Sequence, residues 1–195
     1  MLTGLIRLLT LPLMLGSIAL VGGLVSPARG HSFTTVLIVP PDTPDAARSE
    51  IVAAFLLAAD ERDGHADEES DGHLGGLDVY LVPVRAGELA DIANAAPDVI
   101  AALLPVEAGL DDVAQATGAV MVGPLDPDGA TAGAFLRGAA GNELAPFAKR
   151  FVAEMGKAPG DGAIASYLVA RRIDEAIREL GGVDDRERLR ALLSQ

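Results

Sequence analysis

Four short apolar segments alternate with helical patterns in the first two thirds of this chain, and this alternation constrains the fold most. Val, Leu and Ile dominate these segments, as is typical of strands buried on both faces of a parallel sheet. Between the first two, Ile51, Phe55 and Ala58 recur with helical spacing. We therefore predict an α/β fold with an open, doubly wound, mostly parallel sheet of four to five strands. The predicted strands cover residues 34–39, 77–84, 98–105 and 119–124.

The last third carries three helical patterns with no strand between them. Phe147, Phe151 and Met155 form one apolar stripe in the first pattern, which we expect to pack in the core. In the second, Arg171 and Glu175 have the spacing of an exposed i, i+4 ion pair. We predict three carboxy-terminal helices over residues 142–156, 161–181 and 184–193.

The first thirty residues have the three-part layout of a secretory signal peptide. Arg7 precedes an uncharged apolar run at 8–25, and small residues around Ala28 and Gly30 offer cleavage sites. We expect export to a periplasm, no remaining membrane span, and a single domain over residues 31–195. The alternative is an uncleaved anchor, because the run is about long enough to cross a bilayer.

Charge and motifs exclude several classes of function. The formal net charge is −13, with 28 acidic and 15 basic residues, so the surface repels nucleic-acid phosphates and suits cationic ligands or a basic partner. There is no G-x-S-x-G nucleophile motif, and residues 40–45 read PPDTPD where a glycine-rich phosphate loop would follow the first strand. The chain contains no cysteine, hence neither a disulfide framework nor a lipid-attachment site. We expect no enzymatic activity and no firmly bound cofactor.

An acidic loop at residues 60–76 raises the question of a metal site. Asp67, Glu69 and Asp71 occupy positions 1, 3 and 5 of a calcium loop of the EF-hand type, and Asp78 occupies position 12. Glu at position 3 and Asp at position 12 depart from that pattern. The hypothesis is calcium or another hard cation. The alternative is a solvated surface loop, which is the commoner origin of such sequences.

The three histidines suggest a second metal hypothesis. His65 and His73 lie eight residues apart, so zinc or copper would need a third ligand from elsewhere. Cleavage after Gly30 would make His31 the amino terminus, whose amine and imidazole chelate copper. Solvated histidines are the favoured interpretation.

Residues 147–193 resemble the late segment of the Leu/Ile/Val-binding proteins, the type I periplasmic solute-binding proteins of branched-chain amino-acid ABC transporters. Residues 98–109, reading DVIAALLPVEAG, are similar to that family's third strand and the loop after it. Leu168 stands where the family usually has Asp. The matching positions are Phe147, Phe151, Gly156, Pro159, Tyr167, Ala170, Gly181, Gly182, Leu189 and Leu193.

The resemblance implies an exported, non-enzymatic substrate-binding protein, but the length departs from the family. Members have about twice this size, with two α/β lobes that enclose a ligand. Here residues 127–141 alone join the last predicted strand to the late helices, and a single βαβ crossover takes about 30 residues. We therefore predict a single lobe that corresponds to the family's amino-terminal one.

One open lobe would bind a small ligand on a ledge at the carboxyl ends of its strands. Glu107 opposes an anionic ligand group, although a helix N-terminus behind it favours one, so branched-chain amino-acid binding is in doubt. A second copy in a homodimer could complete the ledge. The expected ligand-binding residues are Pro41, Asp42, Pro105, Val106, Glu107 and Asp126.

A second class of function is a periplasmic accessory protein. Some members of the resembled family accompany periplasmic quinoprotein alcohol oxidation rather than uptake. In that class the ledge or the acidic loop would dock a protein partner.

Overall fold

The computed structural model describes residues 32–61, 69–103, 108–123 and 144–194. The strands are β1 (Ser32–Val39), β2 (His73–Leu74), β3 (Leu77–Arg85), β4 (Val99–Ala102) and β5 (Val120–Val122). The helices are α1 (Asp45–Asp60), α2 (Leu89–Asn94), α3 (Leu110–Thr117), α5 (Leu144–Met155), α6 (Asp161–Leu180) and α7 (Arg186–Leu193). None of the helices in these ranges is long and apolar enough to cross a membrane.

The strands form one five-stranded sheet in the order β2-β3-β1-β4-β5. β1 pairs in parallel with β3 and β4, and β5 pairs in parallel with β4, so Val36 lies opposite both Val82 and Ile100. The predicted α/β class and the doubly wound, mostly parallel sheet are confirmed.

The fifth strand, β2, was not predicted. It pairs antiparallel with the start of β3 across a two-residue turn at Gly75 and Gly76, both with positive φ. Two successive positive-φ residues make the turn that best fits a tight hairpin. Gly75 also lies so close to α6 that an added Cβ would stand 2.4 Å from Ile177 Cγ2. The hairpin therefore turns directly against α6.

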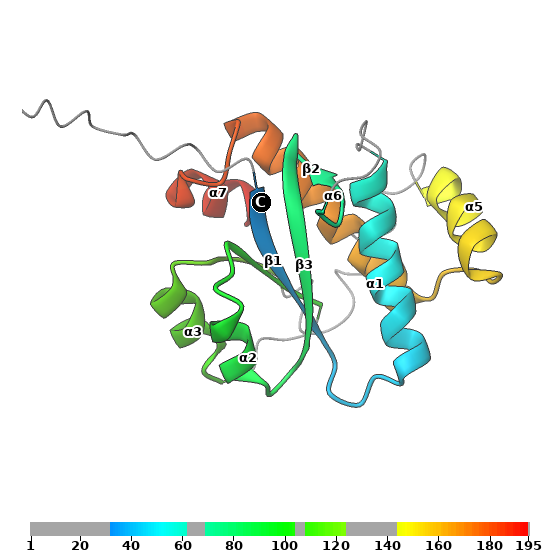
Figure 1. Ribbon diagram of the computed structural model, residues 1–195, viewed down its shortest axis with the longest axis horizontal. Coiled ribbons are helices and arrows are strands. Elements are labelled where there is room, and N and C mark those ends of the chain that lie inside the picture. Colours follow the sequence, from blue (N-terminus) through cyan, green and yellow to red (C-terminus); the bar gives the residue numbers. More distant parts are fainter. Residues whose placement is uncertain (1–31, 62–68, 104–107, 124–143, 195) are drawn as a thin grey trace, which may run out of the picture.

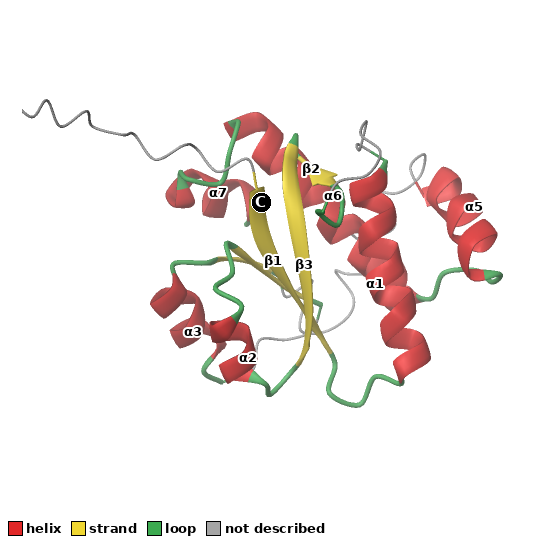
Figure 2. Cartoon of the chain, viewed as in Figure 1, coloured by secondary structure: helices red, strands yellow, loops and turns green. Residues whose placement is uncertain are grey.

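Helices cover both faces of the sheet (Figures 1 and 2). On the first face, Phe33 and Leu37 of β1 share a core with α1, α5, α6 and α7. On the second face, Val36 and Ile38 share a smaller core with α2 and α3. This alternation along β1 follows from the two-residue period of a strand, whose side chains point to opposite faces in turn.

The three carboxy-terminal helices are confirmed, and they complete the first face. Phe147 and Phe151 are fully buried, Met155 is partly buried against the same core, and Phe147 stacks on Tyr167 with ring centroids 4.1 Å apart. Large aromatic side chains contribute much of the burial energy of such a core.

The predicted surface pair of Arg171 and Glu175 is wrong. Arg171 is 9% exposed, and its Nη1 lies 3.6 Å from Oδ2 of Asp174, which is fully buried. Glu175 points to solvent. Arg178 Nη2 also binds both oxygens of Asp174, at 2.7 and 2.8 Å. Arg171 therefore pairs with Asp174 and not with Glu175, and this pair is buried inside the fold.

Asp174 also joins α6 to the hairpin, because its Oδ1 accepts a hydrogen bond of 2.8 Å from Gly75 N. A buried carboxylate is tolerated only when it is paired and hydrogen-bonded, as here. Loss of this carboxylate would leave Arg178 and the Gly75 N–H without their acceptor and Arg171 without its nearer counter-ion.

We predict that Asp174→Ala lowers the free energy of unfolding by about 3–5 kcal/mol, the usual cost of breaking a buried ion pair. Urea denaturation followed by circular dichroism measures this. Glu175→Ala, a change at the exposed neighbour, is the control and should cost less than about 0.5 kcal/mol. Equal effects of the two changes would contradict the structural role given to Asp174.

Candidate functional site at the carboxyl edge of the sheet

The chain connections diverge between the carboxyl ends of β1 and β4. After β1 the chain runs to α1 on the first face, whereas after β4 it runs to α3 on the second face. Ligands of open α/β sheets bind where neighbouring connections diverge in this way. The carboxyl ends of these strands, called the carboxyl edge of the sheet below, are therefore the candidate binding site.

Two of the six predicted ligand-binding residues lie at this edge. Pro41 and Asp42 form the turn directly after β1, and both are exposed. The other four predicted residues, Pro105, Val106, Glu107 and Asp126, lie outside the described residues.

Arg85, which the sequence analysis did not identify, holds the loop between β1 and α1. Its Nη1 donates to the carbonyl oxygens of Pro41 at 3.1 Å and Thr43 at 3.0 Å. Its Nη2 pairs with Asp45 Oδ1 at 2.8 Å. A guanidinium presents several donors in a fixed planar arrangement, so one side chain can fix three acceptors at once. The available signal was an arginine that directly follows an apolar strand.

The charge at this edge is mostly negative. Asp45 is paired with Arg85, and Glu88 Oε2 accepts a hydrogen bond of 3.1 Å from the Arg85 backbone N–H. Asp42 makes no hydrogen bond or ion pair within the described part of the chain, and it is exposed. The edge therefore offers one uncommitted carboxylate on a loop fixed by Arg85, an arrangement that suits a cationic ligand group.

Two described carboxylates of the candidate calcium site contact protein groups. Asp71 Oδ2 accepts a 2.8 Å hydrogen bond from Leu81 N, and Asp78 Oδ1 lies 2.8 Å from His73 Nε2. Glu69 is exposed. Over the described ranges no three His, Asp or Glu side chains gather as a metal centre requires. Asp67, His65 and His31 lie outside those ranges, and calcium, zinc and copper binding stay predictions.

The hydrogen bond that Asp71 accepts from Leu81 N satisfies a backbone group at the outer edge of β3. Beyond β2 no strand of the described residues pairs with this edge, so its backbone groups need other partners. Asp71 accepts from Leu81 N, Pro83 has no N–H, and Arg48 Nη2 donates to Pro83 O at 2.8 Å. Proline and charged side chains are common means of protecting an edge strand from pairing with another chain. This edge of the sheet is closed to further strands.

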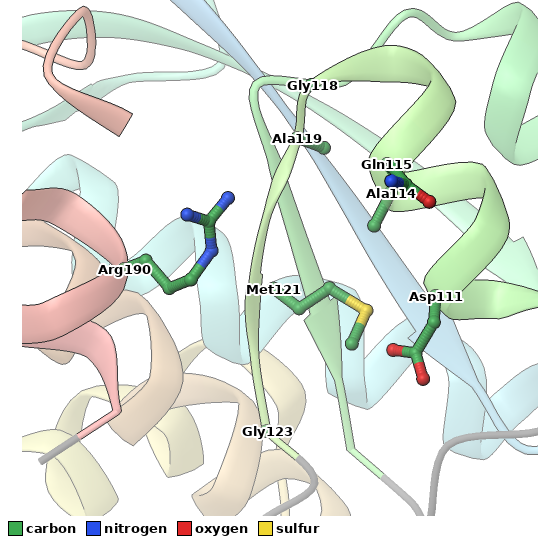
Figure 3. Close-up of a pocket in the computed structure, with 8 residues that line it drawn as sticks. All are labelled: Asp111, Ala114, Gln115, Gly118, Ala119, Met121, Gly123 and Arg190. Atoms are coloured by element: carbon green, nitrogen blue, oxygen red, sulfur yellow. The ribbon is translucent and has the colours of Figure 1, made fainter. Parts of the chain in front are cut away.

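A groove of about 470 Å³ lies at the opposite edge of the sheet, along the edge strand β5 (Figure 3). Met121 of β5 lies in its middle, with Arg190 of α7 on one side and Asp111 of α3 on the other. The remaining lining residues are Ala114, Gln115, Gly118, Ala119 and Gly123.

The fold defines an open, doubly wound α/β protein, and comparison with known proteins adds a weak likeness. No family model matches the chain, and no curated protein matches it. One solved structure that matches the chain weakly is a branched-chain amino acid ABC transporter periplasmic ligand-binding protein from Burkholderia xenovorans. The identity is 17% and the TM-score 0.24, over 82% of this chain and 45% of the other. The chain thus spans less than half the length of that protein.

We predict that Arg85→Ala loosens the β1–α1 loop without unfolding the protein. Hydrogen bonds from a charged donor contribute about 1.5–3 kcal/mol, so local opening should become about tenfold more frequent. Amide hydrogen exchange at Thr43 measures this. Lys149→Ala, which removes an exposed positive charge from α5, is the control. Unchanged exchange at Thr43 in the Arg85 variant would contradict the anchoring role.

Proposed function

We propose that this chain is a non-enzymatic, solute-binding-like protein, related to the substrate-binding components of ABC transporters. It binds a small cationic ligand at the open carboxyl edge of the sheet. The observation that carries the proposal is the Arg85-anchored loop, which holds the exposed carboxylate of Asp42 just after the carboxyl end of β1. Its placement in a periplasm rests on the predicted signal peptide at residues 1–30.

The charge of the edge determines which ligand we expect. Asp42 and Glu88 attract an ammonium group and repel a carboxylate, and the net charge of −13 adds long-range attraction for cations. A free branched-chain amino acid carries both groups, so its carboxylate opposes binding here. An amine with the same side chain and no carboxylate is the better ligand.

The open edge also limits the affinity. Tight small-molecule sites bury most of the ligand surface, and binding must offset the lost freedom of the ligand. A ligand on a single open lobe keeps water on one side. We therefore expect dissociation constants in the micromolar to millimolar range, which become weaker as salt screens the charges.

Isothermal titration with 3-methylbutylamine and leucine tests this proposal, because the amine is leucine without its carboxylate. We predict that the amine binds at least tenfold more tightly and that Asp42→Asn weakens its binding about tenfold. Glu175→Gln, an exposed change on α6 next to the residue that binds the β2–β3 turn, is the control and should leave binding unchanged.

Equal affinities for the two compounds would contradict the proposed site. So would binding of the amine to Asp42→Asn with undiminished affinity. Heat from calcium that disappears in Asp67→Ala and Asp71→Ala would instead support a metal-responsive accessory role through the acidic loop. If none of the amine, leucine and calcium gives heat of binding, the solute-binding proposal is contradicted, and a periplasmic protein partner is favoured.

A further inference from the structure

The two outer edges of the sheet differ in how their backbone groups are satisfied. The β3 edge is closed by Asp71, Pro83 and Arg48. On β5, Val120 N donates to Asp98 O at 2.9 Å, so the backbone of Val120 faces β4. Because neighbouring residues of a strand face opposite sides, the N–H and C=O of Met121 point outward. No described residue bonds to them.

The groove along β5 has room for a further strand. Its volume is about 470 Å³, and Met121 lies at its floor half-buried. The residues just before and after β5 that line the groove, Gly118, Ala119 and Gly123, are small and leave space beside Met121 for an approaching backbone. An edge strand with unpaired backbone groups is a template for an added strand.

The walls of the groove carry opposite charges on opposite faces of the sheet. Arg190 comes from α7, which packs on the first face, and Asp111 comes from α3 on the second (Figure 3). Neither side chain has an ion-pair partner within the described ranges. Arg190 is an exposed guanidinium in a chain with a net charge of −13. Side chains of an added strand would meet these two walls in alternation.

We propose that this groove binds an extended peptide segment of a partner protein, which adds to the sheet as a strand beside β5. Its backbone pairs with the N–H and C=O of Met121. Its acidic side chains face Arg190, and the alternate side chains, basic or hydroxyl-bearing, face Asp111 and Gln115. The site is separate from the ledge at Asp42 and goes beyond the proposed binding of a small cation.

A second copy of this chain is a poorer occupant than a peptide. If two β5 strands paired antiparallel about a twofold axis, both α3 helices would lie on the same face of the joined sheet. Asp111 and Asp112 of the two copies would then approach each other, and like charges across an interface oppose association. A peptide with alternating charge meets no such repulsion.

The test uses an acetylated and amidated peptide, Glu-Lys-Glu-Val-Glu-Lys-Glu, titrated into the purified protein and followed by NMR. We expect saturable shifts at Met121 and Gln115, and slower hydrogen exchange at the Met121 amide. Arg190→Glu should weaken binding at least tenfold. Met121→Pro removes the outward N–H, which an edge strand tolerates, and should abolish binding, whereas Met121→Leu should retain it.

Two controls separate strand addition from simple charge attraction. The same peptide with N-methyl groups at its three central residues keeps every charge but loses backbone donors, and it should not bind. Asp42→Asn should leave peptide binding unchanged, so that failure at the ledge and failure at β5 can be told apart.

Several results would overturn the proposal. One is the absence of saturable shifts. Another is equal binding of the N-methylated peptide together with unchanged binding by Arg190→Glu. A third is a homodimer of the free protein, seen by sedimentation and lost in Met121→Pro, which would assign this edge to a second copy.

Discussion

The packing of α6 against α1 and the first face of the sheet is the interaction on which the rest of this structure depends. α6 buries Tyr167, Ile173 and Ile177 in the larger core. Through Asp174 it also fixes the hairpin that begins β3. β3 in turn ends in Arg85, whose guanidinium sets the loop that carries Asp42. A helix that follows the last described strand by almost forty residues thus supports the start of a strand pair formed much earlier in the chain.

The same dependence explains why the two edges of the sheet differ. The β3 edge lies beside the hairpin and α1, which supply Asp71 and Arg48 as partners for its backbone. The β5 edge has α3 and α7 on either side, but among the described residues nothing bonds to the outward backbone of Met121. One edge is closed by specific side chains, and the other lies open between charged walls. That asymmetry is the reason to regard β5 as a binding edge.

Sequence patterns were sufficient for four of the five strands and for the three carboxy-terminal helices, because apolar runs and helical spacing report burial directly. The strands from 34–39 and 77–84 were placed to within about two residues of β1 and β3. Contacts that join distant residues could not be predicted in this way. The spacing of Arg171 and Glu175 suited a surface pair, but Arg171 is buried beside Glu61 at the end of α1 and pairs with Asp174, while Glu175 stays exposed. The spacing of Asp71 fitted a calcium loop. In the structure Asp71 instead accepts a hydrogen bond from Leu81 N, because the hairpin brings the two residues together, and no local sequence pattern predicted that hairpin.

We infer that α5, α6 and α7 belong to the same cooperative unit as the sheet. Native-state hydrogen exchange of the purified protein in low concentrations of denaturant tests it most directly, because it reports the opening free energy of each segment. We expect the slowest amides of α6 and β1 to open with the same free energy, equal to that of global unfolding. Exchange in α6 through a separate opening of much lower free energy, with β1 still protected, would contradict it.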